Sequence, residues 1–347
     1  MVYWVVAGPL PPEKAGRPRR AGASWQVARP RGPANPRAPA GALQGGAAGG
    51  PMKHGGPAEE GGRPGPGYAG PSAADGKGAP MQVVILCGGQ GTRIRDVADD
   101  LPKPMIPVGG RPILWHIMKG LAGHGFNDFV LCLGYKSKVI KRYFLDYGLD
   151  AADFRVRLGS DRYEVLDGRC DEDWRVTLVE TGLEAMTGAR LKRAGRYVTG
   201  DNFLLTYGDG VADVDVRALV AFHLSHGRTA TVTAVQPPGR FGEIELDGRR
   251  VTEFSEKPLL SRGRINGGFM VFRRRFLDLL PEGDDVVLEQ EPLMGLAREG
   301  ELMAYLHDGF WQCMDSSRDH KLLNDLWAQG QAAWRTWGPA PRLRAAA

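Results

Sequence analysis

The stretch LCGGQGTRIRDVADDLPKPM, residues 86–105, continues an apolar run, QVVILC, at residues 82–87. A continuous apolar run predicts a central strand that is covered on both faces. A glycine-rich loop directly after such a strand lies where open α/β sheets bind their ligands. Glycines also let backbone N–H groups approach phosphate oxygens without interference from a Cβ atom. The stretch therefore predicts an α/β sheet with a phosphate-binding loop after its first strand.

Two cations in this stretch, Arg93 and Lys103, are suited to neutralising a bound triphosphate. Pro102 and Pro104 flank Lys103 and restrict the backbone around it. The loop is neither a Walker A sequence nor a GxGxxG fingerprint, so those two kinds of nucleotide site are excluded. A structural turn with two solvated cations is the alternative, and it accounts poorly for the glycines, Arg93 and the PKPM unit together.

The rest of the chain alternates between apolar strands and amphipathic helices. We expect strands at 82–87, 129–133, 175–180, 202–207 and 230–236, and helices at 112–123, 138–147 and 216–226. Such alternation predicts a mixed, mainly parallel sheet flanked by helices, with right-handed crossovers. After residue 239 the pattern becomes richer in strands, which predicts a smaller β-rich C-terminal part. Its expected strands are 243–246, 250–254 and 268–272, and its helices 292–299 and 318–329.

Residues 1–80 differ in composition from everything that follows, with 14 Pro and 18 Gly. Such a segment cannot bury enough apolar surface to offset the entropy lost on ordering, so we expect a disordered extension. The change at Met81 is abrupt, and our hypothesis is that translation begins there. N-terminal sequencing of the natural protein tests this, since a mature chain carrying residues 1–80 would contradict it. We expect one domain at 81–338 and a flexible tail at 339–347.

Charge and cysteine content narrow the class of protein. The whole chain has 45 Lys+Arg and 40 Asp+Glu; residues 1–80 hold 10 and 4 of these, which leaves 35 and 36 in residues 81–347. A nearly neutral domain argues against nucleic-acid binding, which needs a basic face. No apolar run reaches 18 residues, so we expect no membrane partner. The four cysteines show no CxxC or zinc spacing, which favours reduced thiols in a cytoplasmic protein.

The strand, the GGQGTR loop and the PKPM lysine resemble the sugar-phosphate nucleotidyltransferases. Within that family the sequence is most similar to the glucose-1-phosphate cytidylyltransferases, over about 81–338. The motifs that carry this likeness are GRPILWHIMK (110–119), VTLVETG (176–182), MTGARLKR (186–193), TYGDGVAD (206–213), PPGRFG (237–242), EKP (256–258), INGGF (265–269), EQEPL (289–293) and GFWQCMDSSRD (309–319). The resemblance implies a Rossmann-like, GT-A-like nucleotidyltransferase fold and a homo-oligomer.

The resemblance also implies a reaction: transfer of a cytidylyl group from CTP to α-D-glucose 1-phosphate, giving CDP-glucose and pyrophosphate. This product is a precursor for deoxysugar and O-antigen polysaccharide synthesis. Relatives that use other bases share the loop, so UTP, dTTP or GTP stays open as the nucleotide. A non-catalytic nucleotide-binding regulatory homologue is a further alternative, although such a protein would not need all of the charged residues named below.

The family likeness extends to individual site residues. We expect the nucleotide to be bound by Leu86, Cys87, Gly88, Gly89, Gly91, Thr92, Arg93, Lys103 and Gly208. We expect the sugar phosphate to be bound by Thr187, Arg190, Glu256, Lys257 and Asn266. Arg93, Lys103 and Asp209 are the expected catalytic residues. For Glu256 and Lys257 the alternative is ordinary surface charge.

Asp209 and Asp315 are implied to hold Mg²⁺. Asp209 directly follows a predicted strand, where a carboxylate can reach the carboxyl edge of the sheet. Mg²⁺ favours one or two protein carboxylates plus phosphate and water. Structural alternatives stay open at this point: a turn aspartate for Asp209, a helix N-cap for Asp315, and a hairpin turn for Asn266-Gly267-Gly268.

The sequence departs from the family pattern at two places. Cys87 stands where alanine is usual, which would make the site sensitive to thiol reagents if the thiol is reactive. Ser316-Ser317 replaces a Thr-Leu-like pair after Asp315, so the support of that carboxylate differs. We expect the tryptophans of the C-terminal part to pack or to form subunit contacts rather than to stack on a base; they are Trp311, Trp327, Trp334 and Trp337.

Overall fold

The computed structural model describes residues 81–89, 91, 94, 96–97, 100–150, 152–158, 163–167, 172–238, 243–247, 249–255 and 263–338. The predictions of a disordered extension at 1–80 and of a flexible tail at 339–347 lie outside these residues.

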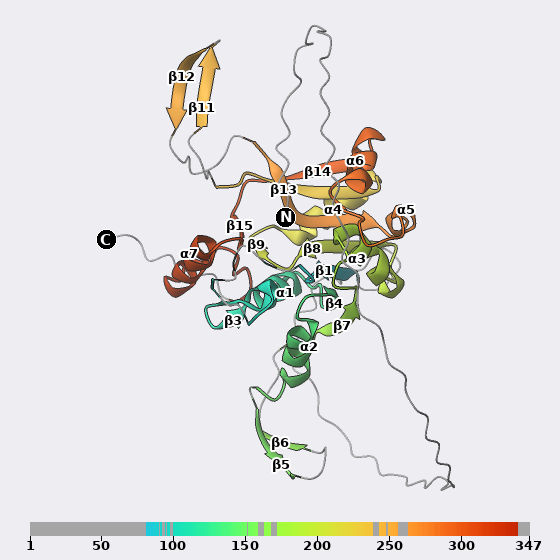
Figure 1. The fold of residues 1–347 in the computed structure, drawn as a ribbon, viewed down its shortest axis with the longest axis vertical. Coiled ribbons are helices and arrows are strands. Elements are labelled where there is room, and N and C mark those ends of the chain that lie inside the picture. Colours follow the sequence, from blue (N-terminus) through green and yellow to red (C-terminus); the bar gives the residue numbers. More distant parts are fainter. Residues whose placement is uncertain are drawn as a thin grey trace, which may run out of the picture. The chain divides into compact units, whose positions relative to one another are not determined.

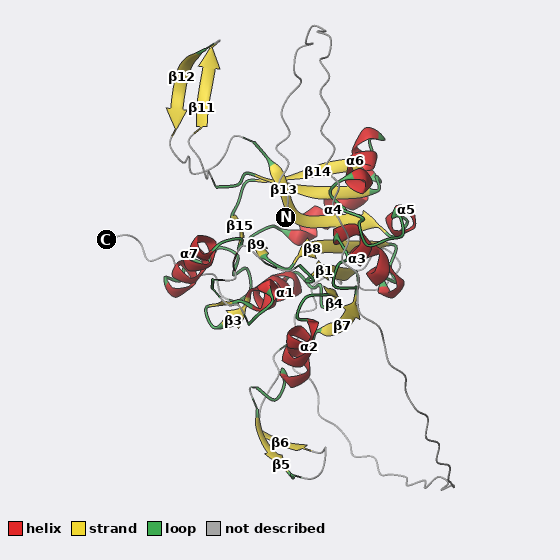
Figure 2. Cartoon of the chain, in the orientation of Figure 1, coloured by secondary structure: helices red, strands yellow, loops and turns green. Residues whose placement is uncertain are grey.

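A seven-stranded sheet forms the centre of the described fold (Figures 1 and 2). Its strand order is β14-β10-β13-β8-β1-β4-β7. The strands are β1 Gln82–Leu86, β4 Asp128–Leu133, β7 Arg175–Glu180, β8 Asn202–Tyr207, β10 Ala230–Val235, β13 Ile265–Arg273 and β14 Leu302–His307. Strand β13 runs antiparallel to both of its neighbours, and every other pair in the sheet is parallel. The predicted mixed, mainly parallel sheet is confirmed.

Helices and short strand pairs surround the sheet. The helices are α1 Ile113–Gly123, α2 Ser137–Asp146, α3 Thr187–Ala194, α4 Val216–His226, α5 Phe276–Leu279, α6 Glu291–Arg298 and α7 Ser317–Ala328, with single 3-10 turns η2 Lys103–Met105 and η3 Gly195–Tyr197. The short pairs are β2 Pro107–Val108 with β3 Arg111–Pro112, β5 Asp153–Val156 with β6 Tyr163–Asp167, β9 Gly210–Ala212 with β15 Trp311–Cys313, and β11 Glu243–Asp247 with β12 Arg250–Ser255.

Successive residues of the central strands point to opposite faces of the sheet and enter two separate cores. Val83 and Ile85 of β1 belong to one core, and Val84 and Leu86 belong to the other. The first core also takes apolar residues of α1, α4 and α7, and the second takes those of α3, α5 and α6. Helices therefore cover both faces of the sheet, as the continuous apolar run of β1 predicts.

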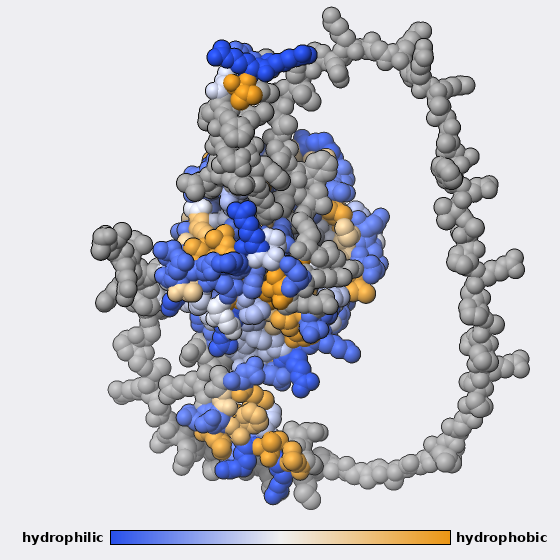
Figure 3. Space-filling model, turned by 60° about the vertical axis from the view of Figure 1, so that its left-hand side comes forward, coloured by the Kyte–Doolittle hydropathy of each residue, from blue (hydrophilic) through white to orange (hydrophobic). Residues whose placement is uncertain are grey.

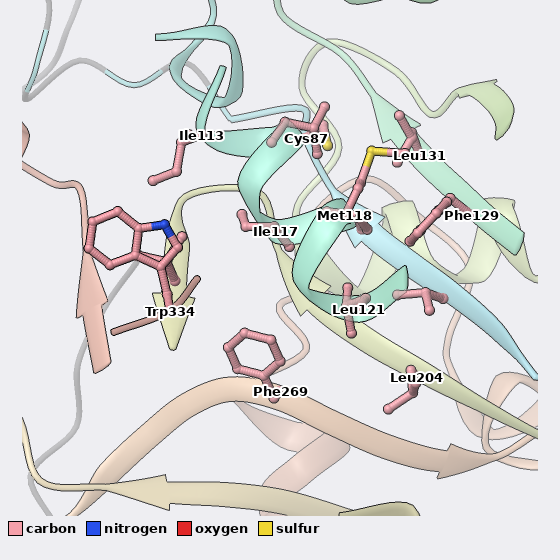
Figure 4. Packing of buried hydrophobic residues seen from close by; sticks show 14 of the residues in the cluster. Cys87, Ile113, Ile117, Met118, Leu121, Phe129, Leu131, Leu204, Phe269 and Trp334 are labelled. Carbon is pink, nitrogen blue, oxygen red and sulfur yellow. The ribbon is translucent and has the colours of Figure 1, made fainter. Parts of the chain in front are cut away.

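Helix α1 shows how one of these faces is filled (Figure 4). Ile113, Ile117, Met118 and Leu121 recur at helical spacing and are at most 3% exposed. They face residues of β4 and β8, and Trp334 from the C-terminal segment lies in the same core. The expectation that these tryptophans pack is confirmed at Trp334, which is 2% exposed.

The strands β11 to β14, which follow residue 239, belong to two different sheets. Strands β13 and β14 join the central sheet, whereas β11 and β12 pair with each other. Asn266-Gly267-Gly268 lies inside β13, so the hairpin alternative for these residues is wrong. The register of β13 against β10 shifts here, and a Cβ atom on Gly267 would lie 2.6 Å from Val235 Cγ1. Close approach of two strands at a bulge therefore explains Gly267. Gly268 has φ +87°, and a Cβ atom there would lie 2.5 Å from Tyr207 Cδ2.

The described part of the chain contains no helix with both the length and the apolar character needed to span a bilayer. Figure 3 shows hydrophobic side chains in separate groups among hydrophilic ones on the face that it presents. One set of exposed apolar side chains belongs to β5 and β6: Phe154, Val156, Tyr163 and Val165 are between 45% and 56% exposed.

Candidate active site

The predicted site residues gather where β1 and β8 end. These neighbouring strands are parallel, with Leu86 beside Tyr207, so their carboxyl ends lie at the same edge of the sheet. The glycine loop continues from β1, and Gly208 and Asp209 continue from β8; Gly208 N donates to Leu86 O at 3.1 Å. A cleft of about 570 Å³ opens at this edge. This is the position at which open α/β sheets bind ligands.

Most of the predicted residues line this cleft. They are Leu86, Cys87, Gly88, Gly89, Gly91, Lys103, Thr187, Arg190, Gly208, Asp209 and Asp315. Asn266 does not line it but donates through Nδ2 to the hydroxyl of Tyr207, which does, at 3.4 Å. The remaining predicted residues, Thr92, Arg93, Glu256 and Lys257, fall outside the described residues. The structure thus brings together residues from 86 to 315 that the sequence separates.

Lys103 is held by a short 3-10 turn. Pro102 O accepts from Met105 N at 2.8 Å, and the side chains of Pro104 and Met105 are buried. Gly91 packs against the lysine with φ +58°, and a Cβ atom there would lie 3.1 Å from Lys103 Cβ. Glycine is required at residue 91 because it alone adopts this backbone conformation freely and leaves the space. Gly91 and Lys103 of the PKPM unit therefore contact each other in one wall of the cleft.

The Lys103 ammonium lies between two carboxylates. Nζ donates to Asp209 Oδ2 at 2.7 Å and also to Asp315 Oδ1. The side chains of Lys103, Asp209 and Asp315 are 13%, 17% and 4% exposed. Burial alone would lower the pKa of Lys103, but the two carboxylates outweigh burial and raise this pKa to about 12. The cleft therefore holds a permanently charged ammonium whose position is fixed from two sides.

A pairing of two short strands explains why Asp209 and Asp315 meet. Strands β9 and β15 are antiparallel, and Cys313 lies opposite Gly210. Met314 N then donates to Asp209 O at 2.8 Å, which places the next residue, Asp315, beside the first carboxylate. These two aspartates, 106 residues apart in the chain, are thus joined by backbone geometry as well as by Lys103.

Helix α7 supports Asp315 from behind. Its N-cap is Ser316, so the N-cap alternative for Asp315 is wrong. Ser316 and Asp319 form a capping box, and Asp319 Oδ2 also accepts from Asp315 N at 3.1 Å. Gln312 Nε2 donates to Asp319 Oδ1 at 3.1 Å. The Ser316-Ser317 departure from the family pattern therefore keeps a cap that holds the carboxylate in place.

Ser316→Ala removes the side chain of this cap and should destabilise the protein by about 1 kcal/mol, the usual effect of losing an N-cap. Equilibrium unfolding in urea measures the change. Ser317→Ala, one residue further on, is the matched control and should change stability by less than about 0.5 kcal/mol. Equal stabilities of the two variants would contradict the role of Ser316 as the cap.

The two aspartates suit a divalent cation. Asp209 Oδ1 is buried and has no hydrogen-bond partner among the described residues. That part of the chain contains no group of three or more His, Cys, Asp or Glu side chains arranged for a metal. A site with only two carboxylates fits an ion that takes its other ligands from phosphate and water. An unpaired buried carboxylate oxygen at this cleft has the chemistry that such an ion requires of a protein ligand.

Arg190 has a different environment from the predicted sugar-phosphate contact. It is 5% exposed, and its terminal nitrogens donate to protein oxygens at 2.8–3.1 Å. Four of these are carbonyl oxygens and one is a hydroxyl: Leu133 O, Gly182 O, Gly88 O, Leu183 O and Thr181 Oγ1. A Cβ atom on Gly88 would lie 2.1 Å from Arg190 Nη1. Arg190 therefore fixes the first glycine of the loop, and its contact with substrate stays a prediction.

Cys87 lines the cleft but is 1% exposed. Burial raises the pKa of its thiol well above the ordinary value. Because the thiolate is the reactive form, this cysteine behaves as a small apolar residue. The expected sensitivity to thiol reagents therefore has no support in the environment of Cys87.

A second polar group lines the cleft beside the predicted sugar-phosphate residues. Thr187 Oγ1 donates to Glu289 Oε2 at 2.7 Å, and the Tyr207 hydroxyl donates to Glu289 Oε1. Glu289 and Tyr207 were not among the predicted site residues, although both lie in motifs that carry the family likeness. The only feature of the sequence that pointed to Glu289 was its place in the EQEPL motif before a predicted helix. This place does not show which other segments of the chain the side chain contacts.

The chain matches the nucleotidyl transferase family over residues 82–311. It is 51% identical over 258 residues to a glucose-1-phosphate cytidylyltransferase of Salmonella typhi, a match that covers 74% of this chain and 100% of that protein. It is 42% identical over 257 residues to a probable glucose-1-phosphate cytidylyltransferase of Bacillus subtilis, with the same coverages.

Solved structures agree at the level of the fold. The inositol-1-phosphate CTP transferase from T. maritima superimposes with a TM-score of 0.51 and 16% identity, over 76% of this chain and 99% of that one. The sequence matches agree with three features of the structure. These are the glycine loop, the Lys103–Asp209–Asp315 cluster and the strand order. The chain belongs to the nucleotidyl transferase family and, within it, to the glucose-1-phosphate cytidylyltransferases.

Proposed function

We propose that this chain transfers the cytidylyl group of CTP to α-D-glucose 1-phosphate, giving CDP-glucose and pyrophosphate. The observation that carries the proposal is the buried Lys103–Asp209–Asp315 cluster beside the glycine loop. Relatives of 51% and 42% identity bear the name of this activity and support the choice of CTP and glucose 1-phosphate. The product would supply deoxysugar and O-antigen polysaccharide synthesis.

The chemistry requires positioning and charge rather than a base. A phosphate oxygen of the sugar phosphate forms a bond to the α-phosphorus of CTP, and the bond from that phosphorus to the pyrophosphate oxygen breaks. Because the attacking group is already an anion at neutral pH, no proton needs to be removed first. Lys103 then stabilises negative charge at the phosphates, and backbone N–H groups of Gly88–Gly91 hold the nucleotide. We assign the same electrostatic role to Arg93.

Mg²⁺ is the ion that we propose for Asp209 and Asp315; members of this family generally use a divalent metal. When bound, it would neutralise charge on the triphosphate and on the departing pyrophosphate. The two carboxylates would hold it from the β8 and β15 sides of the cleft. Lys103 would then be released toward the phosphates, because its two present partners would be engaged.

Pyrophosphate release with each of CTP, UTP, dTTP and GTP, against a panel of sugar 1-phosphates and with Mg²⁺, tests the proposal. We expect release with CTP and glucose 1-phosphate. Release with another base or sugar instead would identify a related nucleotidyltransferase. Lack of release with every pair would favour a regulatory protein that only binds nucleotide.

We also propose that the enzyme is a cytoplasmic homo-oligomer. The exposed apolar side chains of β5 and β6 would be covered in such an assembly. Light scattering on the purified protein measures the subunit number, and a monomer at micromolar concentration would contradict the proposal.

A further inference from the structure

Glu289 is a carboxylate in the cleft wall, distinct from the aspartates beside Lys103. It belongs to the segment just before α6 and lines the cleft together with Gly88 and Lys103. Thr187, at the start of α3, donates to Oε2 at 2.7 Å, and Tyr207, at the end of β8, donates to Oε1. Each carboxylate oxygen is therefore oriented by a hydroxyl from a different element of the fold.

The two hydroxyls are themselves held in place. Thr187 Oγ1 accepts from Leu288 N at 2.9 Å, so its proton is directed to Glu289. Asn266 Nδ2 donates to the Tyr207 hydroxyl at 3.4 Å. Glu289 is thus fixed as an acceptor.

The carboxylate keeps unused acceptor capacity. It has about four acceptor positions, and the hydroxyls of Thr187 and Tyr207 occupy two of them. Among the described residues, no cation lies within ion-pair distance of Glu289. An unneutralised carboxylate repels phosphate and accepts hydrogen bonds from neutral O–H donors. The free positions therefore suit the hydroxyls of a sugar and not its phosphate.

We propose that Glu289 binds hydroxyl groups of the hexose in the sugar 1-phosphate, with Thr187 and Tyr207 as positioning residues. This inference rests on the proposed function and adds a residue that determines sugar specificity. Tyr207 lies two residues before Asp209, so the acceptor and the Lys103 cluster share the end of β8. A sugar 1-phosphate can then place its hydroxyls at Glu289 and its phosphate at Lys103.

Glu289→Gln is the first test, because the amide keeps the size of the side chain but removes its charge and one acceptor oxygen. The KM for glucose 1-phosphate should rise about 10- to 100-fold, the usual effect of losing a hydrogen bond to a charged group, and the KM for CTP should change less than about twofold. Glu291→Gln is the matched control. Glu291 is 76% exposed, pairs with Arg298 and does not line the cleft, so both KM values should stay unchanged.

Deoxyglucose 1-phosphates separate direct contact from structural support. The unaltered enzyme should use the analogue that lacks the contacted hydroxyl poorly, and Glu289→Gln should no longer discriminate against it, because the same contact cannot be lost twice. Equal loss with every analogue would show a purely structural role and overturn the proposal. A rise in the KM for CTP alone would overturn it as well, since Glu289 would then contact the nucleotide.

The two proposals fail in different ways. Active enzyme with CTP and glucose 1-phosphate, together with an unaffected Glu289→Gln variant, would overturn the role of Glu289 and leave the proposed function standing. An inactive unaltered enzyme, which also fails to bind glucose 1-phosphate in calorimetry, would overturn both.

Discussion

Lys103→Ala should lower kcat by about 30- to 1,000-fold, because one preorganised charge donor contributes about 2–4 kcal/mol to the transition state. The loss is expected in this range since the ammonium is 13% exposed, lines the cleft and is positioned by the η2 turn. Steady-state pyrophosphate release measures it. Lys321→Ala is the matched control, because Lys321 is 76% exposed and pairs with Asp325 on α7. A Lys103→Ala variant with unaltered kcat would refute the role of Lys103.

The pH dependence of this contribution follows from the raised pKa. Asp209 and Asp315 raise the pKa of Lys103 from 10.5 to about 12, so the charged form is favoured in the folded protein. The contribution of the charged Lys103 to the stability of the folded protein is complete below pH 10.5. It is lost only as the pH rises toward 12. Titration of Lys103 should therefore contribute nothing to a rate profile recorded between pH 6 and 9.

The same variant also tests the exchange between Lys103 and a metal. Without Lys103, two buried carboxylates face each other with no counter-charge, which is destabilising. Mg²⁺ should therefore raise the melting temperature of Lys103→Ala more than that of the unaltered enzyme. Equal shifts would show that the lysine and the cation do not compete for the carboxylates.

The sequence predicted those helices and strands that have a pattern of apolar residues within their own length. Strands β7 and β8 and helix α4 begin and end where the apolar pattern placed them. The elements that were missed depend on distant partners. Strands β9 and β15 have three residues each and pair across a gap of about 100 residues, so neither has a periodicity of its own. Strand β14, at the edge of the sheet, is half-buried and alternates weakly.

The chemistry of the site was predictable by residue type but not by contact. Lys103, Asp209 and Asp315 were recognised from motifs, yet their mutual contact depends on the β9–β15 pairing. Arg190 was assigned to the substrate, and the structure shows its guanidinium bound to oxygens of separate segments. Glu289 received no role, because its hydroxyl partners lie 102 and 82 residues away. In each of these cases the contact depends on how distant segments of the chain pack together, which local sequence patterns do not show.

Asp209→Asn should lower kcat by about 10²- to 10⁴-fold, because a divalent cation contributes several kcal/mol of charge stabilisation and this carboxylate is one of its two proposed ligands. Asparagine keeps the shape of the side chain, and Asp315 still accepts from Lys103, so the fold should survive. Mn²⁺ binding, followed by electron paramagnetic resonance, should weaken in the same variant without any measurement of turnover.

Asp215→Asn is the control for Asp209→Asn. Asp215 is the N-cap of α4, a position that asparagine also fills well, and it does not line the cleft. Turnover and Mn²⁺ affinity should both be unaltered in this variant. Combining Asp209→Asn with Lys103→Ala should cost less than the sum of the separate losses, since the two side chains act through one contact. Strict additivity would show that Asp209 and Lys103 act independently, whereas normal Mn²⁺ binding by Asp209→Asn would show that the cation binds elsewhere.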